Sequence, residues 1–129
     1  MNHITEKTGT GAFGELLVQI RLLQCGVQAA PPIKDSGNDL IAVNGNEFRA
    51  VSVRTTTRES YTKPAEERAY HVLAVVHLVD DEDEVFLDQS ELFLIPIAEV
   101  SAASTRHANL GEYKFSKEQV AKLFGPLRV

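Results

Sequence analysis

The sequence DSGNDLIAVNGNEFRAVSVR, residues 35–54, has the pattern of two short strands joined by a tight turn. An apolar run from Leu40 to Val43 precedes a turn around Gly45, a residue type that adopts positive φ without steric cost. The chain then returns through residues 48–53, where large apolar side chains alternate with others. This pattern predicts an antiparallel hairpin that begins at Asp39.

The second strand of this hairpin carries polar side chains in one phase of the alternation. Because successive residues of a strand point to opposite sides, Ser52 and Arg54 share one face, and Val51 and Val53 share the other. We therefore expect Ser52 and Arg54 to lie on one surface together with the nearby Asp39.

This arrangement resembles the PD-(D/E)XK nuclease superfamily, which includes restriction endonucleases and archaeal-type Holliday junction resolvases. Asp39 resembles the central aspartate of the motif, and Glu15 resembles the helix-borne glutamate that many members place before the hairpin. Ser52 stands where the family has Glu or Gln, and Arg54 stands where it has Lys, both at a usual spacing from the aspartate. The resemblance covers roughly residues 11–76, and two of its three signature positions are changed.

The resemblance implies an α/β fold with a restriction-endonuclease-like αβββαβ core, in which helices flank a mixed sheet. It also implies that Glu15 and Asp39 hold a divalent metal ion such as Mg²⁺, with the backbone carbonyl of Val53 as a third ligand. The catalytic set carried over from the family is Glu15, Asp39, Ser52 and Arg54.

The two changed positions alter the expected chemistry. Ser52 offers a neutral hydroxyl in place of a carboxylate ligand. An arginine stays protonated in proteins, so Arg54 can clamp a phosphate but cannot accept a proton from water. We therefore expect impaired catalysis, and replacing Ser52 by Glu and Arg54 by Lys would rebuild the family's constellation.

The loop that follows the hairpin contains basic and hydroxyl side chains and few aliphatic ones. Arg54, Arg58, Tyr61 and Lys63 make it the best candidate for contacts with the phosphates of a nucleic acid. An ordinary charged surface loop explains the same residues equally well. With a formal net charge of −5, the chain would have to bind DNA through such a local patch and not through its overall charge.

The 129 residues, 43% of them hydrophobic, fit one domain spanning residues 1–129. Neither a signal sequence nor an apolar stretch long enough to span a bilayer is present, which predicts a cytoplasmic protein without membrane contact. The single cysteine, Cys25, excludes an internal disulfide, and we expect it to be a small buried side chain.

An amphipathic helix is predicted before the hairpin, and it carries two apolar stripes. The main stripe comprises Phe13, Leu16, Leu17, Ile20 and Leu23, and the second comprises Val18, Leu22 and Cys25. We expect the main stripe to face the sheet. The second stripe then requires cover from other segments or from a second subunit, and we predict a homodimer.

Further elements are expected along the rest of the chain. A short edge strand should end before Pro31, a short helix should occupy residues 64–70, and a buried strand should run from His71 to Val79. Two more strands are expected at residues 85–87 and 92–97, and Ser116 should cap a final helix. The acidic run at residues 80–84 and the four histidines, at positions 3, 71, 77 and 107, lack the spacing of metal sites.

Two function classes follow. In the first, the chain is a nuclease-like protein that binds DNA, or hydrolyses it with a metal ion, through Glu15, Asp39, Ser52 and Arg54. In the second, the nuclease fold has lost its chemistry, and the chain is a regulatory or immunity-type module that binds a protein partner. The acidic net charge favours the second class.

Overall fold

The expected hairpin forms part of a mixed five-stranded sheet in the computed structural model, which describes residues 3–33, 39–66, 68–81 and 84–127. Side chains are described from Thr10 onward. The strands of this sheet follow the order β1-β2-β3-β4-β7. Their bounds are Gln28–Ala30 for β1, Leu40–Asn44 for β2, Glu47–Thr56 for β3, Val72–His77 for β4 and Glu91–Pro96 for β7.

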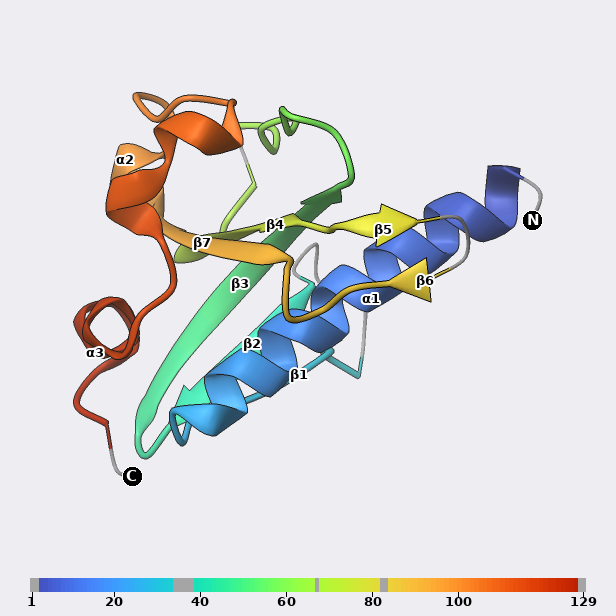
Figure 1. Ribbon diagram of the computed structural model, residues 1–129. Coiled ribbons are helices and arrows are strands. Elements are labelled where there is room, and N and C mark those ends of the chain that lie inside the picture. Colours follow the sequence, from blue (N-terminus) through green and yellow to red (C-terminus); the bar gives the residue numbers. More distant parts are fainter. Residues whose placement is uncertain (1–2, 34–38, 67, 82–83, 128–129) are drawn as a thin grey trace.

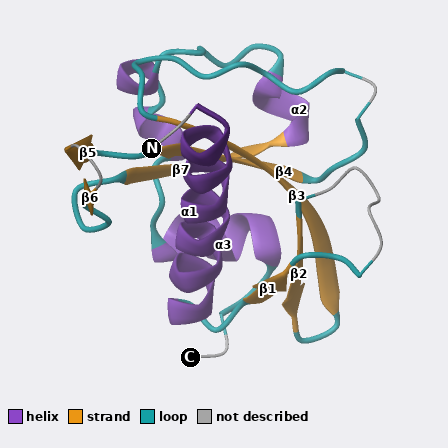
Figure 2. Ribbon diagram, turned by 90° about the vertical axis from the view of Figure 1, so that its right-hand side faces the viewer, coloured by secondary structure: helices purple, strands orange, loops and turns teal. Residues whose placement is uncertain are grey.

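The helices pack on the two faces of this sheet (Figures 1 and 2). The long helix α1, His3–Gln24, and the last helix α3, Lys117–Phe124, contribute to the core on one face. The short helix α2, Ile97–Val100, and the 3-10 turns His107–Asn109 and Gly111–Tyr113 cover the other face. The predicted α/β fold with a mixed sheet flanked by helices is therefore confirmed.

Strands β2 and β3 pair as predicted from their sequence. Leu40 lies opposite Val51, and the antiparallel ladder runs to Asn44 opposite Glu47. Gly45 occupies the turn with φ of 61°, a conformation that side chains with a Cβ rarely adopt. The pattern of residues 40–53 was therefore sufficient to predict this hairpin.

Strand β4 lies between β3, which runs parallel to it, and β7, which runs antiparallel. Residues Val72 to Val76 are all buried, as their unbroken apolar run predicts for a strand covered on both faces. Strands β1 and β7 form the two edges. Pro96 is the last residue of β7, so its missing N–H interrupts no interior ladder.

The final helix begins as the sequence predicts. The Ser116 side chain accepts a hydrogen bond of 3.0 Å from the backbone N–H of Gln119, which satisfies one of the free donors in the first turn. Beyond the helix, the side-chain amide of Asn44 donates to the carbonyls of Phe124 and Pro126, at 2.9 and 3.1 Å. These bonds fix the end of α3 against the turn side of the hairpin.

The helix predicted at residues 64–70 is absent from the described part of that segment, residues 64–66 and 68–70. The side chains of Tyr61, Pro64 and Tyr70 are buried, and the two tyrosines belong to the core layer on the sheet face away from α1. The backbone N–H of His71 then bonds to the carbonyl of Ala50 at 2.9 Å. Here burial of side chains at irregular spacing outweighs the local preference of the sequence for a helix.

Two other expectations are also corrected. Val85 pairs with Asp80 in a separate two-stranded hairpin, made of β5, Asp80–Asp81, and β6, Glu84–Val85, so residues 85–87 add no strand to the main sheet. The acidic run thus carries two short strands, and its residues 82–83 lie outside the described part. The polar segment after β7 contains α2 and the 3-10 turns, which are elements that the sequence did not predict.

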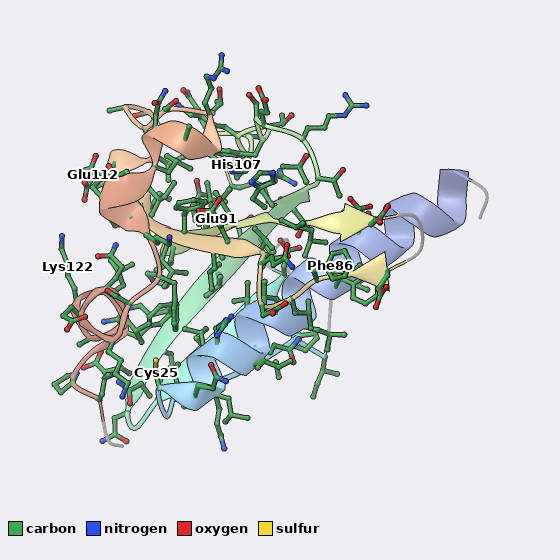
Figure 3. The ribbon with its side chains drawn as sticks, in the orientation of Figure 1. Cys25, Phe86, Glu91, His107, Glu112 and Lys122 are labelled. Atoms are coloured by element: carbon green, nitrogen blue, oxygen red, sulfur yellow. The ribbon has the colours of Figure 1, made fainter. Side chains whose placement is uncertain are left out.

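The two stripes of α1 are assigned in reverse by the structure. Val18, Leu22 and Cys25 are buried against the sheet together with Leu17 (Figure 3 labels Cys25 at the end of α1). The rest of the expected main stripe is exposed: Phe13, Leu16, Ile20 and Leu23. Periodicity marks both stripes as apolar, but only packing against the sheet decides which one is covered. No helix among the described residues is long and apolar enough to cross a bilayer.

Candidate functional site

A hollow of about 580 Å³ lies where α1 passes the end of β3. It brings together side chains from three parts of the chain: the middle of α1, the residue before β2, and the last residues of β3 with the loop beyond. Its lining comprises Thr10, Gly11, Glu15, Asp39, Val53, Arg54, Thr55, Thr56, Thr57 and Arg58. Two carboxylates and two guanidinium groups therefore share one opening.

The carboxylates of Glu15 and Asp39 interact within this hollow. Burial raises the pKa of Glu15 from its ordinary value of 4.5, and the negative charge of Asp39 raises that pKa further. The two carboxyl groups therefore lie within range of electrostatic interaction, and both line the hollow. A shared site for these two residues is what the resemblance implies.

Asp39 is oriented by the backbone of β3. Its Oδ2 atom accepts a hydrogen bond of 2.7 Å from the N–H of Val53, and its own N–H donates to the carbonyl of Val51 at 3.2 Å. A hydrogen bond this short to a charged acceptor is among the stronger ones in proteins. The carboxylate is therefore held at the edge of the hollow with one oxygen engaged by the strand.

The position of Glu15 depends on how closely α1 approaches β3. A Cβ atom added at Gly14 would overlap the side chain of Thr55, so only glycine allows the helix to lie at this distance. Since Glu15 is the next residue, the contact between Gly14 and Thr55 also sets the depth of its carboxylate in the hollow.

The basic side of the hollow consists of Arg54 and Arg58. The Nε atom of Arg54 is buried and has no hydrogen-bond partner among the described residues. The backbone N–H of Arg58 bonds to the side-chain oxygen of Thr56 at 2.9 Å, which shapes the turn that carries this exposed arginine. The exposed guanidinium group of Arg58 suits an anion such as a phosphate.

Ser52 does not line the hollow. Its side chain is fully buried, at 0% exposure, and its hydroxyl has no partner among the described residues. In the parallel ladder it lies opposite Leu73, which belongs to the core layer on the face away from α1. The strand face that carries Val51 and Val53 packs against α1. Because side chains alternate along a strand, Ser52 lies on the other face of the sheet, toward the opposite core layer. The structure thus brings Glu15 and Asp39 to one hollow and leaves Ser52 apart. Arg54 lines the hollow but shares the strand face of Ser52, and its charge acts on Tyr70 in the opposite core layer.

Tyr61 and Lys63 also lie outside the hollow. Tyr61 is buried, and its hydroxyl donates to the carbonyl of Ser104 at 3.0 Å, while burial raises its pKa. The Lys63 ammonium group donates to the carbonyl of Ser101 at 3.0 Å. The patch expected from the sequence therefore divides into two arginines at the hollow and two residues that fasten the loop to residues 101–104.

Sequence reasoning missed the threonines of the hollow. Thr55, Thr56 and Thr57 directly follow Arg54, and their composition by itself predicts only a loop, although β3 extends to Thr56. A run of hydroxyl side chains next to an arginine is a weak signal for an oxyanion ligand. Gly14 was missed because a close approach between a helix and a strand leaves no local mark in the sequence.

The histidines form no metal site. Among the described residues, no group of three or more His, Cys, Asp or Glu side chains could hold an ion. His107 is instead buried and stacks on His77, with ring centroids 4.3 Å apart and planes inclined by 8°. Figure 3 labels His107 above the sheet and Glu91, the first residue of β7, within it. His71 accepts a hydrogen bond of 2.8 Å at Nδ1 from the N–H of Ala50.

Comparison with known proteins identifies a similar fold. No protein-family model matches the sequence, and no curated protein matches it. Among solved structures, that of a bacterial homing endonuclease, I-Ssp6803I, superimposes with a TM-score of 0.56. The match covers 81% of this chain and 83% of the other, at 12% sequence identity. The chain therefore has an α/β fold similar to that of this endonuclease.

Proposed function

We propose that this protein is a PD-(D/E)XK-like protein that binds DNA through the hollow and holds a divalent cation there, with impaired hydrolytic activity. The observation that carries this proposal is the convergence of Glu15 and Asp39, from separate elements, on a hollow that also contains Arg54 and Arg58. The fold that this chain shares with a homing endonuclease supports it.

The oxygen atoms of the hollow fit a Mg²⁺ ion. Glu15 and Asp39 supply two carboxylates, and the backbone carbonyl of Val53 adds a third oxygen if the family's geometry applies. Mg²⁺ prefers oxygen ligands and usually keeps several waters, so one or two carboxylates are enough when a phosphate completes its shell. When bound, the ion would polarise a phosphate oxygen and lower the pKa of a coordinated water.

The side chains of this chain would make two kinds of contact with a phosphate. Arg54 and Arg58 would bind its oxygens, and the hydroxyls of residues 55–57 would donate further hydrogen bonds. Neither arginine can take a proton from an attacking water. The position occupied by Ser52 supplies no carboxylate to the hollow. These two deficits account for the proposed loss of rate, while the groups needed for binding are retained.

DNA is the proposed partner because Arg54 and Arg58 line the hollow on a chain of net charge −5, and a cation held by Glu15 and Asp39 would offset the two carboxylates there. Such binding would depend on a small number of phosphate contacts, and would therefore weaken steeply with salt. The cytoplasmic location expected from the sequence stays a prediction.

A second candidate function, that of a protein-interaction module, is favoured by one observation. Four large apolar side chains are exposed along α1: Phe13, Leu16, Ile20 and Leu23, the last three of which line a hollow beside β1 and β2. An apolar patch of this kind is typical of a surface that binds another protein. The two functions use different surfaces, so one chain can have both.

Titration calorimetry with Mn²⁺ or Mg²⁺ tests the cation site. We expect binding by the wild type and its loss in Asp39→Asn, which keeps the shape of the side chain and an acceptor for the N–H of Val53. Asp88→Asn, an exposed change away from the hollow, serves as the matched control. If wild type and Asp39→Asn are equally unable to bind either ion, the proposed cation site is wrong.

Cleavage of supercoiled plasmid in Mg²⁺ tests the impaired chemistry. We expect slow nicking or none by the folded wild type, together with retained binding of a short duplex. Robust cleavage that disappears in Arg54→Ala would show that an arginine is sufficient at this position, and would contradict the proposed impairment.

A further inference from the structure

The loop that carries Arg58 is fastened to a distant segment of the chain. We define the Arg58 loop as residues 57–63 and the supporting segment as residues 101–107, which lie side by side (Figure 1). Backbone contacts join the two segments in three pairs: Glu59 with His107, Ser60 with Arg106, and Tyr61 with Thr105. In the first and last pairs, the N–H groups of His107 and Tyr61 donate hydrogen bonds of 3.0 Å. The path of the Arg58 loop therefore depends on the supporting segment.

The side chain of His107 lies where the Arg58 loop leaves the sheet. Its ring is 4% exposed and stacks on that of His77, the last residue of β4. His77 is the partner of Thr56 in the parallel ladder, and β3 ends at Thr56. The centroid of the Tyr61 ring, which belongs to the loop, lies 6.1 Å from that of His107. The imidazole of His107 therefore supports the loop against the end of the sheet.

Both nitrogens of the His107 ring are buried, and neither has a hydrogen-bond partner among the described residues. The backbone of Arg58 acts on the ring and raises its pKa, but no hydrogen bond of good geometry joins the two. A neutral imidazole leaves one donor unsatisfied here, whereas an imidazolium would bury two donors and a full charge. Protonation therefore favours a conformation in which the ring reaches water, and this movement takes the supporting segment away from the Arg58 loop.

The groups on the sheet side of His107 do not compensate for this cost. Burial lowers the pKa of His107 below 6.5, and His77 lowers it further, while the Glu91 carboxylate raises it. That carboxylate lies 3.6 Å from Nδ1 of His77 and 3.8 Å from Nζ of Lys114, so its charge acts on two other bases as well. Phe93, whose ring centroid is 6.0 Å from that of His107, adds no charge. Burial therefore prevails over the attraction of Glu91.

The groups on the loop side are engaged elsewhere. The Glu59 carboxylate pairs with Arg106 at 3.4 Å, and both side chains are exposed, so water screens their charges. The Tyr61 hydroxyl donates to the carbonyl of Ser104, and burial raises the pKa of this tyrosine, which keeps it neutral. Arg58 is exposed and has the same charge as an imidazolium. These groups give a protonated His107 little compensation for its burial.

We propose that His107 is a positioning residue for the hollow: while neutral it holds the Arg58 loop in place, and its protonation releases the loop, so that Arg58 loses its phosphate contact. This regulation rests on the proposed function of the hollow. DNA binding would then weaken as the pH falls below 6.5. The loss of negative charge from an acidic chain would by itself strengthen the binding of DNA in acid, so the two effects have opposite signs.

Amide hydrogen exchange without DNA or metal tests the release of the loop. A histidine that titrates at 6.5 in the open loop, and well below that value in the closed loop, favours opening by about tenfold at pH 5.5. We therefore expect the protection factor of the Tyr61 amide to fall by about this factor from pH 7.5 to 5.5, and those of the β4 amides to fall less. His107→Phe should remove the fall, whereas His71→Gln, at an exposed histidine, should keep it.

Fluorescence anisotropy with a short duplex at constant ionic strength tests the consequence for binding. We expect the wild type to lose affinity between pH 7.5 and 5.5 relative to His107→Phe, by no more than about tenfold. In an Arg58→Gln background, His107→Phe should change nothing, because the loop no longer carries the contact. A wild type that binds no DNA at either pH refutes the proposed function, and the exchange of the Tyr61 amide still tests the release of the loop.

Glu91→Gln provides a second variant should His107→Phe fail to fold. It removes a charge that raises the pKa of His107, and should therefore enlarge the fall in the protection of Tyr61. Equal protection of the Tyr61 amide at both pH values overturns the proposal. So does a fall that His107→Phe retains, a fall that the β4 amides share equally, or a DNA affinity with the same pH dependence in wild type and His107→Phe.

Discussion

Gly14 of α1 lies against Thr55 of β3 so closely that no side chain fits between the helix and the strand. The contact is adjacent to the hollow in which the Glu15 carboxylate approaches Asp39. One backbone position thus controls both the packing of the longest helix and the separation of two acidic groups. Gly14, which makes the close contact between helix and strand, is adjacent in the sequence to Glu15, which lines the hollow.

Replacing Gly14 by Ala should lower the free energy of unfolding by about 1–3 kcal/mol, the usual cost of inserting a methyl group into a packed contact. The helix must move away from Thr55, which should also weaken cation binding at Glu15. Urea unfolding and calorimetry measure the two effects. Gly11→Ala is the matched control, since a Cβ atom there meets nothing within 4 Å, and alanine favours a helix by up to about 1 kcal/mol. Equal behaviour of the two variants would contradict the close contact.

Asp39→Asn should lower the pKa of Glu15, because it removes the negative charge that adds to the effect of burial. Burial should keep this pKa above 4.5 in the variant. A carboxyl with a raised pKa in the folded state makes the fold less stable as pH rises from 4.5 through that raised pKa. Glu15→Gln should therefore flatten the pH dependence of stability in this range, and cation binding should strengthen as Glu15 ionises. A carbon-detected NMR titration of the carboxyl groups measures the shift, and an unchanged Glu15 in Asp39→Asn would refute the coupling.

Ser52→Glu should destabilise the fold by about 3 kcal/mol or more, because it buries a carboxylate without a partner. This differs from the outcome expected on the resemblance alone, in which Glu at position 52 joins the site and the fold is unaffected. Ser52→Ala is the control, and it should be nearly neutral because the hydroxyl makes no hydrogen bond with the described residues. Thermal unfolding of Ser52→Glu and Ser52→Ala distinguishes these two outcomes. A stable Ser52→Glu variant that also gains metal-dependent nicking would show that the side chain can turn toward the hollow.

His107→Phe should make the protein less sensitive to acid. Burial lowers the pKa of His107 below 6.5, and the neighbouring His77 lowers it further, against opposing contributions from Glu91 and the Arg58 backbone. A base whose folded pKa is lowered binds fewer protons in the folded state. Its contribution to stability is therefore complete above pH 6.5 and is lost as pH falls below that value. Phenylalanine keeps the stacking with His77 but cannot be protonated. Urea unfolding at pH 7.5 and 5.5 should show a smaller difference for the variant than for wild type, and an equal difference would exclude His107 as the source.

Arg58→Gln should weaken DNA binding at every duplex sequence and reduce the slope of log affinity against log salt by about 1, as expected for the loss of one phosphate contact. This prediction rests on the proposed function. Lys63→Gln removes one positive charge a few residues away, but at a side chain that bonds to Ser101 and does not line the hollow. Fluorescence anisotropy at several salt concentrations compares the two variants. If both variants lower the slope of log affinity against log salt equally, DNA binds through the charge of the whole loop and not through contacts in the hollow.

The sequence by itself determined the features that depend on neighbouring residues. The hairpin of residues 40–53, its glycine turn and the Ser116 cap follow from backbone preferences and short-range hydrogen bonds, which act within a few residues. The buried strand β4 follows from its unbroken apolar run. The meeting of Glu15 and Asp39 followed from resemblance to a motif, since no local rule relates residues so far apart.

Only the tertiary structure decided which of two apolar stripes on α1 is covered, because both satisfy the same helical period and the sheet can accept one of them. Packing of α1 on one face of the sheet also leaves Ser52 on the opposite face. Burial of Tyr70 in that opposite core layer accompanies the absence of a helix at residues 64–66 and 68–70. Each outcome depends on contacts between segments distant in the chain. Burial of apolar surface is nondirectional and depends on how much surface the whole fold covers. It therefore selects among helices and strands that the local sequence permits equally, and no single local pattern predicts the choice.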